Sequence, residues 1–273
     1  MSPLWRDEVG AYLAPHRLCL ARLKRGIRAS VAAEEDIRLP PVAAGDWTEA
    51  LKALEQRLAE PSWQAARLRL VIADHWVRYT VVQWMTELSS QQECLAHARE
   101  LLASIYGDAL SDWVVSLSEA PPGVARVACA MPHALLDALT SLCKRCGVQL
   151  SSLQPQLIAA YNGWRHRLPD TPAWFVTVDE GSLAAARVGP AGFERVHTVR
   201  IGSDWTREIK RLQTFGRLVN RSAEAGPVFV DAPQTWRQVA GGAAGPELEW
   251  LDDDASVPLT TLQRLGRLRR SAA

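Results

Sequence analysis

The sequence lacks the features that mark several classes of protein. No apolar run reaches about eighteen residues, so no transmembrane helix is expected. The N-terminal stretch has neither the basic flank nor the apolar core of a signal peptide. Five cysteines, an odd number scattered along the chain, argue against a disulfide framework and for a reducing compartment. A net charge of +1 provides no overall attraction to nucleic acid or to an anionic membrane. These absences together predict a cytoplasmic protein.

Motifs of common catalytic and metal sites are also missing. The chain has no phosphate-binding P-loop, no dinucleotide-binding Gly-x-Gly-x-x-Gly string, no serine-hydrolase Gly-x-Ser-x-Gly elbow and no His-Glu-x-x-His pair. Cys143 and Cys146 form a Cys-x-x-Cys pair at a predicted helix end before Gly147, which favours structural thiols over redox or zinc chemistry. The acidic run Asp252–Asp254 is more typical of a solvated turn than of a cation site. The sequence predicts no catalytic residue and no metal ligand.

The composition is that of a soluble globular protein. Of 273 residues 48% are hydrophobic and 22% charged, which allows one large domain or two lobes, each with its own core. Eleven tryptophans accompany only four tyrosines and four phenylalanines. Because an indole joins a large apolar body to a polar N–H, these tryptophans suit cores and interfaces alike.

The segment from Arg69 to Trp84 has the strongest strand pattern. It predicts two strands, Leu68–Ala73 and Trp76–Trp84, separated by Asp74-His75. Side chains alternate along a strand, and both faces of the second run carry bulky groups: Trp76, Arg78, Thr80, Val82 and Trp84 on one, Val77, Tyr79 and Val81 on the other. We therefore expect the second run to be an interior strand covered on both sides.

Two similar series of elements follow one another along the chain, separated by a linker at Leu168–Pro172. Besides the central strands, the first series is predicted to contain strands at His16–Lys24, Ile27–Ala33, Asp36–Leu39, Asp112–Ser118, Val124–Ala130 and Val148–Leu153, and helices at Asp46–Ala59, Gln91–Tyr106, Pro132–Cys146 and Pro155–Arg167. The second is predicted to contain strands at Ala173–Val178, Ser182–Val188, Phe193–Ile201, Val228–Asp231 and Glu247–Leu251, and helices at Asp204–Val219 and from Pro258. The prediction is an α/β protein with one lobe at residues 1–168, carrying an extra block at about 77–130, and a second lobe at residues 173–273.

This repeated order, three strands and then helix, strand, helix, strand, helix, resembles the duplicated actin-like (ribonuclease H-like) fold, with mixed sheets flanked by helices. The strings Leu13–Ser30, Val71–Trp84, Tyr106-Gly107 with Trp113, and Leu150–Asn162 resemble the actin-like proteins of type IV pilus and type II secretion assembly platforms. That family includes PilM, MshI and the cytoplasmic part of GspL.

The resemblance implies an ATP site built from a phosphate-binding turn in each lobe and a glycine pair near the adenosine. Asp179, Gly181 and Ser182 match the second-lobe turn, although Asp-x-Gly also forms plain hairpins, which we favour for Asp179. In the first lobe the hairpin Leu20–Gly26 has no acidic residue, and Val228–Asp231 is followed by Ala232-Pro233 instead of glycines. We expect no catalysis and no cofactor; the alternative is an ATPase that binds ATP and magnesium at Asp179, Gly181 and Ser182.

Two groups of residues are candidates for partner contacts. The resemblance implies a groove beside the extra block that receives a peptide of a membrane-anchored partner, and Trp76, Arg78, Trp84 and Trp113 are the residues that we place there. For Trp76 and Trp84 a position in the sheet core is an equal alternative. At the C-terminus Arg264, Arg267, Arg269 and Arg270 accompany a leucine stripe, so this helix either lies on an anionic membrane surface or packs on the second lobe.

The functional expectation is a non-catalytic scaffold of a type IV pilus or type II secretion-like assembly platform, peripheral to the inner membrane. It would bind a peptide or domain of an inner-membrane partner and take no small-molecule substrate. A nucleotide-switched actin-like ATPase of the same machinery is the alternative. A nucleic-acid adaptor that uses the C-terminal arginines is disfavoured by the near-neutral charge.

Overall fold

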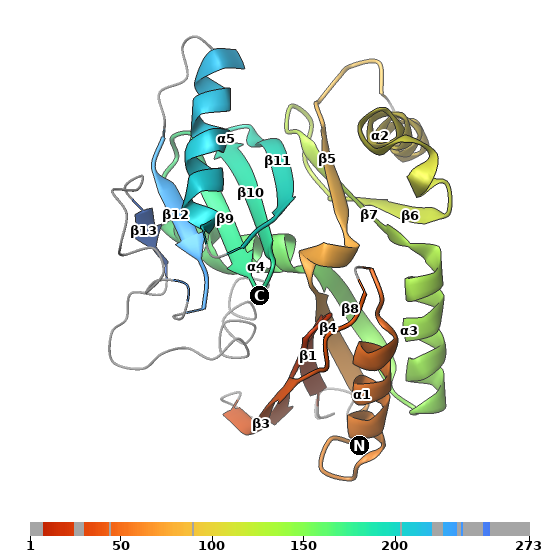
Figure 1. Ribbon diagram of the computed structural model, residues 1–273. Helices are drawn as coiled ribbons and strands as arrows, with labels where there is room; N and C mark the ends of the chain where they lie inside the picture. Colours follow the sequence, from red (N-terminus) through yellow and green to blue (C-terminus); the bar gives the residue numbers. More distant parts are fainter. Residues whose placement is uncertain are drawn as a thin grey trace. The chain divides into compact units, whose positions relative to one another are not determined.

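The computed structural model describes residues 8–24, 30–43, 45–88, 90–202, 204–219, 226–233, 236 and 248–251. The chain divides into two compact units. Within the described residues, the first unit contains residues 8–76 and 131–163, and the second contains residues 77–130 and 164–251. Figure 1 shows the strands and helices of both.

The first unit is built on a five-stranded mixed sheet of order β3-β2-β1-β4-β8. Its strands are β1 (Glu8–Ala14), β2 (Arg17–Lys24), β3 (Ser30–Arg38), β4 (Arg67–Ile72) and β8 (Gln149–Pro155). β1 pairs antiparallel with β2 and parallel with β4, and β4 pairs parallel with β8. The carboxyl ends of β1, β4 and β8 therefore meet at one edge of the sheet.

Helices cover both faces of this sheet. α1 (Thr48–Ala59) packs on β2, α3 (His133–Arg145) packs on β8, and the two helices contact each other (Figure 1). An ion pair between Glu55 Oε1 and Arg145 Nε, 2.7 Å apart, joins these helices. α4 (Gln156–Trp164) covers the opposite face, where its Ala159 packs against alternate residues of β1, β2 and the end of β4. Because helices cover both faces of the sheet, β1 is buried along almost its whole length.

The second unit repeats the sheet order. β9 (Ala173–Asp179), β10 (Ser182–Gly189), β11 (Gly192–Arg200), β12 (Val228–Asp231) and β13 (Leu248–Trp250) form a sheet of order β11-β10-β9-β12-β13. β9 again pairs antiparallel with one neighbour, β10, and parallel with the other, β12. The predicted α/β class, mixed sheets and repeated element order are thus confirmed.

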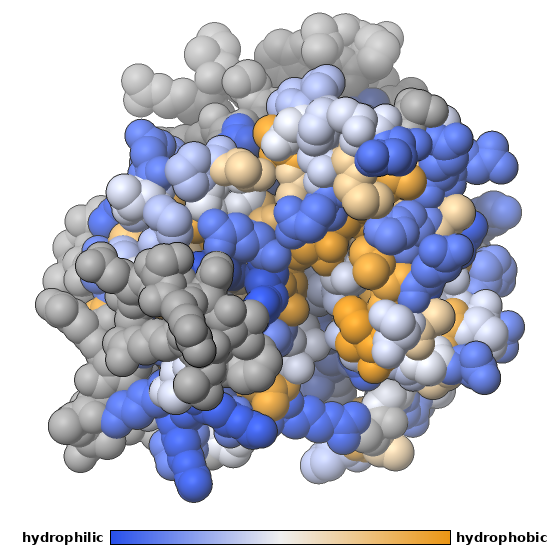
Figure 2. All heavy atoms as spheres, turned by 90° about the horizontal axis from the view of Figure 1, so that it is seen from above, coloured by the Kyte–Doolittle hydropathy of each residue, from blue (hydrophilic) through white to orange (hydrophobic). Residues whose placement is uncertain are grey.

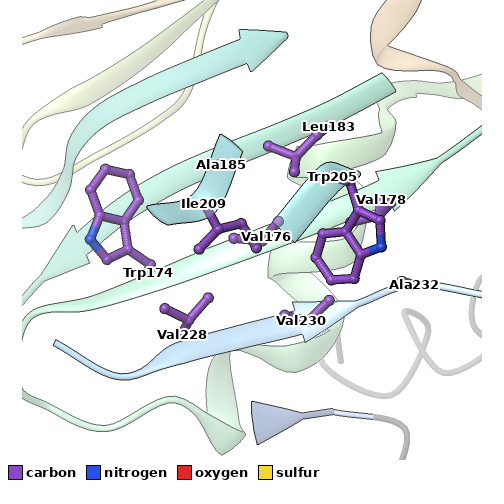
Figure 3. Packing of buried hydrophobic residues seen from close by; sticks show 10 residues of the cluster. All are labelled: Trp174, Val176, Val178, Leu183, Ala185, Trp205, Ile209, Val228, Val230 and Ala232. Atoms are coloured by element: carbon purple, nitrogen blue, oxygen red, sulfur yellow. The ribbon is translucent and has the colours of Figure 1, made fainter. Parts of the chain in front are cut away.

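A buried apolar cluster joins this sheet to α5 (Trp205–Val219). Trp205 and Ile209 of the helix pack on residues of β9, β10 and β12. In Figure 3 the indoles of Trp174 and Trp205 lie at opposite ends of the cluster, with Val176 and Ile209 between them. These tryptophans are core residues, because each is at most 3% exposed.

The second unit also contains a small sheet of order β5-β7-β6, formed by β5 (Arg78–Val82), β7 (Arg126–Pro132) and β6 (Trp113–Leu117). α2 (Gln91–Tyr106) covers it, and Ala98 of this helix packs with Val82 and Ala128. The sheet contacts β11 through β5. Ala125 N–H donates to the Ala191 carbonyl at 3.3 Å, and Gln83 Nε2 donates to the Glu194 carbonyl at 3.4 Å. The block at 77–130 is thus inserted within the first series along the chain but packs with the second.

Three predicted elements need correction. β1 (Glu8–Ala14) is absent from the predicted elements. The predicted strands Ile27–Ala33 and Asp36–Leu39 are one strand, β3. The predicted interior strand Trp76–Trp84 is wrong: a 3-10 turn, Asp74–Trp76, precedes β5, which lies at the edge of its sheet. The predicted helix from Pro258 lies outside the described residues.

We expect Gly226→Ala to destabilise the second unit. A Cβ at residue 226 would lie 2.3 Å from the carbonyl oxygen of Pro172, so backbone would have to move beside β9. Such overpacking should lower the free energy of unfolding by about 1–3 kcal/mol, measured by urea denaturation. Gly202→Ala is the matched control, since a Cβ there meets no atom within 4 Å. Equal stability of the two variants would contradict this account.

Candidate functional site

Arg78, Tyr106 and Trp113 come together at one end of the small sheet. The guanidinium carbon of Arg78 lies 5.8 Å from the ring centroid of Tyr106 and 5.6 Å from that of Trp113. Arg78 Nη1 also donates to the Val77 carbonyl at 2.8 Å. All three side chains are half-buried. A cation held between two aromatic rings is both attracted by their faces and fixed in direction, as in binding hot spots.

α2 brings Tyr106 to this position because its ends are firmly specified. The Ser90 hydroxyl accepts from Glu93 N–H at 3.2 Å, and Glu93 Oε2 accepts from Ser90 N–H at 3.0 Å, which forms a capping box. Gly107, with φ of +68°, ends the helix directly after Tyr106. Tyr106 was not among the predicted site residues, although its place before a helix-ending glycine could have identified it as fixed.

The two other predicted partner residues lie in different surroundings. Trp76 is 2% exposed and belongs to the first unit, whereas Trp84 follows β5 and is 49% exposed. The structure therefore brings Arg78 and Trp113 together and does not place Trp76 with them. Trp84 and Ile105, which is 58% exposed, are large apolar groups open to solvent. On the face that Figure 2 shows, several separate apolar areas lie among hydrophilic residues.

The predicted phosphate turn of the second unit is a tight hairpin between β9 and β10. Asp179 and Ser182 are paired across it, Gly181 has φ of +75°, and both paired side chains are buried. Ile201 N–H donates to the Gly181 carbonyl at 3.1 Å, which ties the turn to the end of β11. The geometry is that of a well-formed hairpin, and the left-handed conformation at residue 181 favours glycine there.

The equivalent turn of the first unit is not the one that the sequence suggested. Strand order matches β1 and β2 with β9 and β10, so the equivalent hairpin is Pro15-His16, with Ala14 paired to Arg17. The predicted hairpin Leu20–Gly26 belongs to the next connection instead: Leu20 to Lys24 continue β2, which pairs antiparallel with β3, and residues 25–29 lie outside the described residues. Pro15 has no N–H, so this turn offers fewer backbone donors than a glycine-containing phosphate turn.

An acidic side chain lies at the same edge of the first sheet. Asp74, only 4% exposed, follows β4, and its Oδ1 accepts from the backbone N–H of Leu157 in the first turn of α4 at 3.3 Å. Beside it Tyr12 donates its hydroxyl proton to Gln156 Oε1 at 2.9 Å. A carboxylate at a helix N-terminus satisfies the donors that would otherwise attract an anion.

In the second unit, β12 is followed by Ala232 and Pro233, as predicted. Ala232 is 1% exposed, and the Pro233 carbonyl accepts from Trp236 N–H at 2.9 Å. The glycines at 241 and 242 lie outside the described residues, as do Asp252–Asp254 and the arginines Arg264, Arg267, Arg269 and Arg270.

Comparison with known proteins identifies the architecture. No protein-family model matches the sequence, and no curated protein does. Among solved structures, the chain is similar to one of a PilM–PilN type IV pilus biogenesis complex, with 14% identity, a TM-score of 0.67, and 97% of this chain and 98% of that chain covered. It is also similar to the cytoplasmic domain of EpsL, an inner-membrane component of the type II secretion system of Vibrio cholerae, with 13% identity, a TM-score of 0.57 and 97% and 94% covered.

A third similar structure is a Bacteroides thetaiotaomicron protein of unknown function with an actin-like ATPase fold. It is 10% identical, with a TM-score of 0.59, and the alignment covers 92% of this chain and 93% of that one. The chain has the actin-like fold. The two sheets share one strand order, so the hairpins β1–β2 and β9–β10 take equivalent places in the two units, which are called the first and second lobe below.

The described residues give no indication of a reactive thiol or of a metal centre. Burial is the main cause that raises the pKa of both Cys143 and Cys146, so both thiols stay protonated at neutral pH and are poor nucleophiles. Among the described residues, no group of three or more His, Cys, Asp or Glu side chains could hold a metal ion. Within the same part of the chain, no helix is both long and apolar enough to cross a bilayer.

We expect Asp74→Ala to destabilise the first actin-like lobe by about 1–2 kcal/mol, because it leaves the Leu157 N–H without its buried acceptor. Asp74→Asn is the matched control, since its amide oxygen can accept the same bond. Urea denaturation followed by circular dichroism measures both. An alanine variant as stable as the asparagine variant would show that the bond contributes nothing.

Proposed function

We propose that this chain is a non-catalytic scaffold of a type IV pilus or type II secretion-like assembly platform. In this role it lies in the cytoplasm, peripheral to the inner membrane, and binds a peptide or domain of an inner-membrane partner. The observation that carries the proposal is the likeness to a chain of the PilM–PilN complex, which covers 97% of this chain and 98% of that one, so few elements of either chain are unmatched. PilM was solved in complex with PilN, and EpsL is an inner-membrane component of a secretion system.

The equivalent turns of the two lobes support the non-catalytic part of the proposal. A phosphate chain between actin-like lobes needs backbone donors from both hairpins. The first hairpin has proline and histidine in place of glycine, and Asp74 at the same sheet edge places a carboxylate on a helix N-terminus. In the second lobe, Pro233 follows β12 where a glycine would allow close approach of a nucleoside.

A nucleotide-switched ATPase is the alternative function. It is favoured by one observation, the β9–β10 hairpin, where Gly181 has the left-handed conformation and stands between Asp179 and Ser182. In that alternative, this turn would hold the phosphates of ATP and Asp179 would face the magnesium ion.

We expect Mg-ATP to leave the melting temperature of the chain unchanged, because the scaffold has no intact nucleotide site. A ligand present at a hundred times its dissociation constant would stabilise the fold by about 2.7 kcal/mol, which is easily detected by differential scanning fluorimetry. Magnesium without nucleotide is the control. A rise in melting temperature with Mg-ATP that Asp179→Ala abolishes would establish the ATPase alternative.

Arg78 and Trp113 are the proposed partner contacts. Their half-buried cation–aromatic cluster offers a rigid apolar surface and a fixed positive charge, which suits a peptide with an aromatic or aliphatic side chain beside a carboxylate. Exposed Trp84, after the other end of β5, extends the apolar surface of the same block. Trp76 is left out of this contact, because it is buried in the first unit.

We expect Trp113→Ala to weaken binding of the partner roughly tenfold or more, since truncating a hot-spot tryptophan costs about 2 kcal/mol. The test uses a synthetic peptide of the cytoplasmic segment of the inner-membrane protein encoded beside this chain, titrated by calorimetry. Ile105→Ala, an exposed apolar change on α2, is the matched control and should bind normally. Full affinity of a folded Trp113→Ala protein would exclude this contact surface.

A further inference from the structure

Strand β6 forms an outer edge of the small sheet, because the strand order is β5-β7-β6. Among the outer strands of the two larger sheets, β3 contains Glu34, Glu35, Asp36 and Arg38, and β11 contains Glu194, Arg195 and Arg200, whereas β8 has no charged residue but ends in Pro155. β6 reads Trp-Val-Val-Ser-Leu, without a charged residue or a proline. A hydrophobic edge of this kind is a template for another strand.

The hydrogen bonds at the end of β6 define which backbone groups face outward. Ser118, the residue directly after β6, donates its N–H to the Val127 carbonyl of β7 at 2.9 Å, and its hydroxyl accepts from Val127 N–H at 2.9 Å. Backbone groups alternate in direction along a strand, so Val114 and Ser116 face β7 as Ser118 does. The N–H and carbonyl groups of Trp113, Val115 and Leu117 therefore point away from the sheet.

These outward groups are open to a partner strand. Across the described part of the chain, no hydrogen bond from outside the sheet reaches the backbone of Trp113, Val115 or Leu117. Ser116 is exposed, and the other four side chains of β6 are only half-buried. The side chains of Val115 and Leu117 pack toward α2, so the sheet face is covered while the strand edge is not.

We propose that β6 pairs antiparallel with β6 of a second copy of this chain, with Val115 opposite Val115 at the two-fold axis. In this register Trp113 lies opposite Leu117 and Val114 opposite Ser116, so large apolar groups meet large ones and small groups meet small ones. Each of Trp113, Val115 and Leu117 exchanges both backbone bonds with its counterpart, which joins two three-stranded sheets into one. The pairing uses the backbone edge of β6, whereas the proposed partner contact uses the side chain of Trp113, so neither proposal rests on the other.

The charges that flank β6 predict how this pairing should depend on salt. No charged residues stand directly opposite each other within the paired strands, since β6 has none. The nearest charged groups along the chain, Asp112 and Glu119, flank the strand, and in this register Asp112 of each copy lies near Glu119 of the other. Added salt screens this mild repulsion, so association should become tighter as ionic strength rises.

Sedimentation velocity of the full chain over a range of concentrations tests the proposal. The wild-type chain should form a dimer, and Val115→Pro should raise the dimer dissociation constant roughly tenfold or more, because it removes the central N–H from both chains. Val115→Ala is the matched control: it loses a similar side chain, keeps the N–H and should still dimerise. A wild-type chain that stays monomeric, or a dimer that Val115→Pro leaves intact, would overturn the proposal.

Hydrogen exchange of the wild-type chain tests the same pairing without a substitution. The amides of Trp113, Val115 and Leu117 should exchange more slowly at high protein concentration, while amides elsewhere in the small sheet stay unchanged. Exchange that is independent of concentration would refute self-pairing, whatever the fold of the proline variant. A monomeric chain whose β6 amides are protected only by an added apolar peptide would assign the edge to a different protein instead.

Discussion

The mixed pairing of two strands, β1 and β9, is the constraint on which both lobes depend. Each pairs antiparallel on one side and parallel on the other. The antiparallel side needs only a tight hairpin, whereas the parallel side needs a crossover that carries a helix. The crossover helices cover the sheets, and the hairpins stand at the edge where the parallel strands end. Every turn discussed as a phosphate site is a product of this arrangement.

The two lobes keep this arrangement with different chemistry in their hairpins. In the second lobe a glycine with positive φ stands between two buried polar residues, Asp179 and Ser182. In the first lobe proline and histidine make the turn, and the neighbouring Asp74 caps α4. A hairpin needs only a compatible backbone, whereas phosphate binding also needs free donors. The fold can therefore be kept even when one hairpin has lost the backbone donors that phosphate binding needs.

Local signals predicted the fold well where they were complete. α2 has the predicted bounds Gln91–Tyr106, and Gly107 ends it as expected; the Ser90–Glu93 capping box, which the prediction did not use, specifies its start. β1 was missed, since it starts with a glutamate and contains Gly10; Glu8 is buried, and Arg69 Nε of β4 lies 3.1 Å from its Oε1. That partner is distant in sequence, and no local pattern reveals it. The missed strand in turn shifted the first-lobe hairpin to the wrong residues.

The candidate site was harder to predict than the fold. Trp76, Arg78 and Trp84 are separated by even numbers of residues, which would place them on one face of a continuous strand. The 3-10 turn Asp74–Trp76 interrupts that strand. One tryptophan is therefore buried and the other half open to solvent. The pairing of Arg78 with Trp113 depends on contacts between strands that are not adjacent in the sheet, which spacing along the chain cannot show.

The block at residues 77–130 begins and ends on paired strands, with Arg78 opposite Ala130. The two points where the chain leaves and rejoins the first unit are thus held side by side by the backbone itself. For the first unit, the whole block amounts to a short closed connection, and the entropy of closing a long loop is offset within the block. Because the two ends of the insertion are paired with each other, its length or surface can change without destabilising the lobe into which it is inserted.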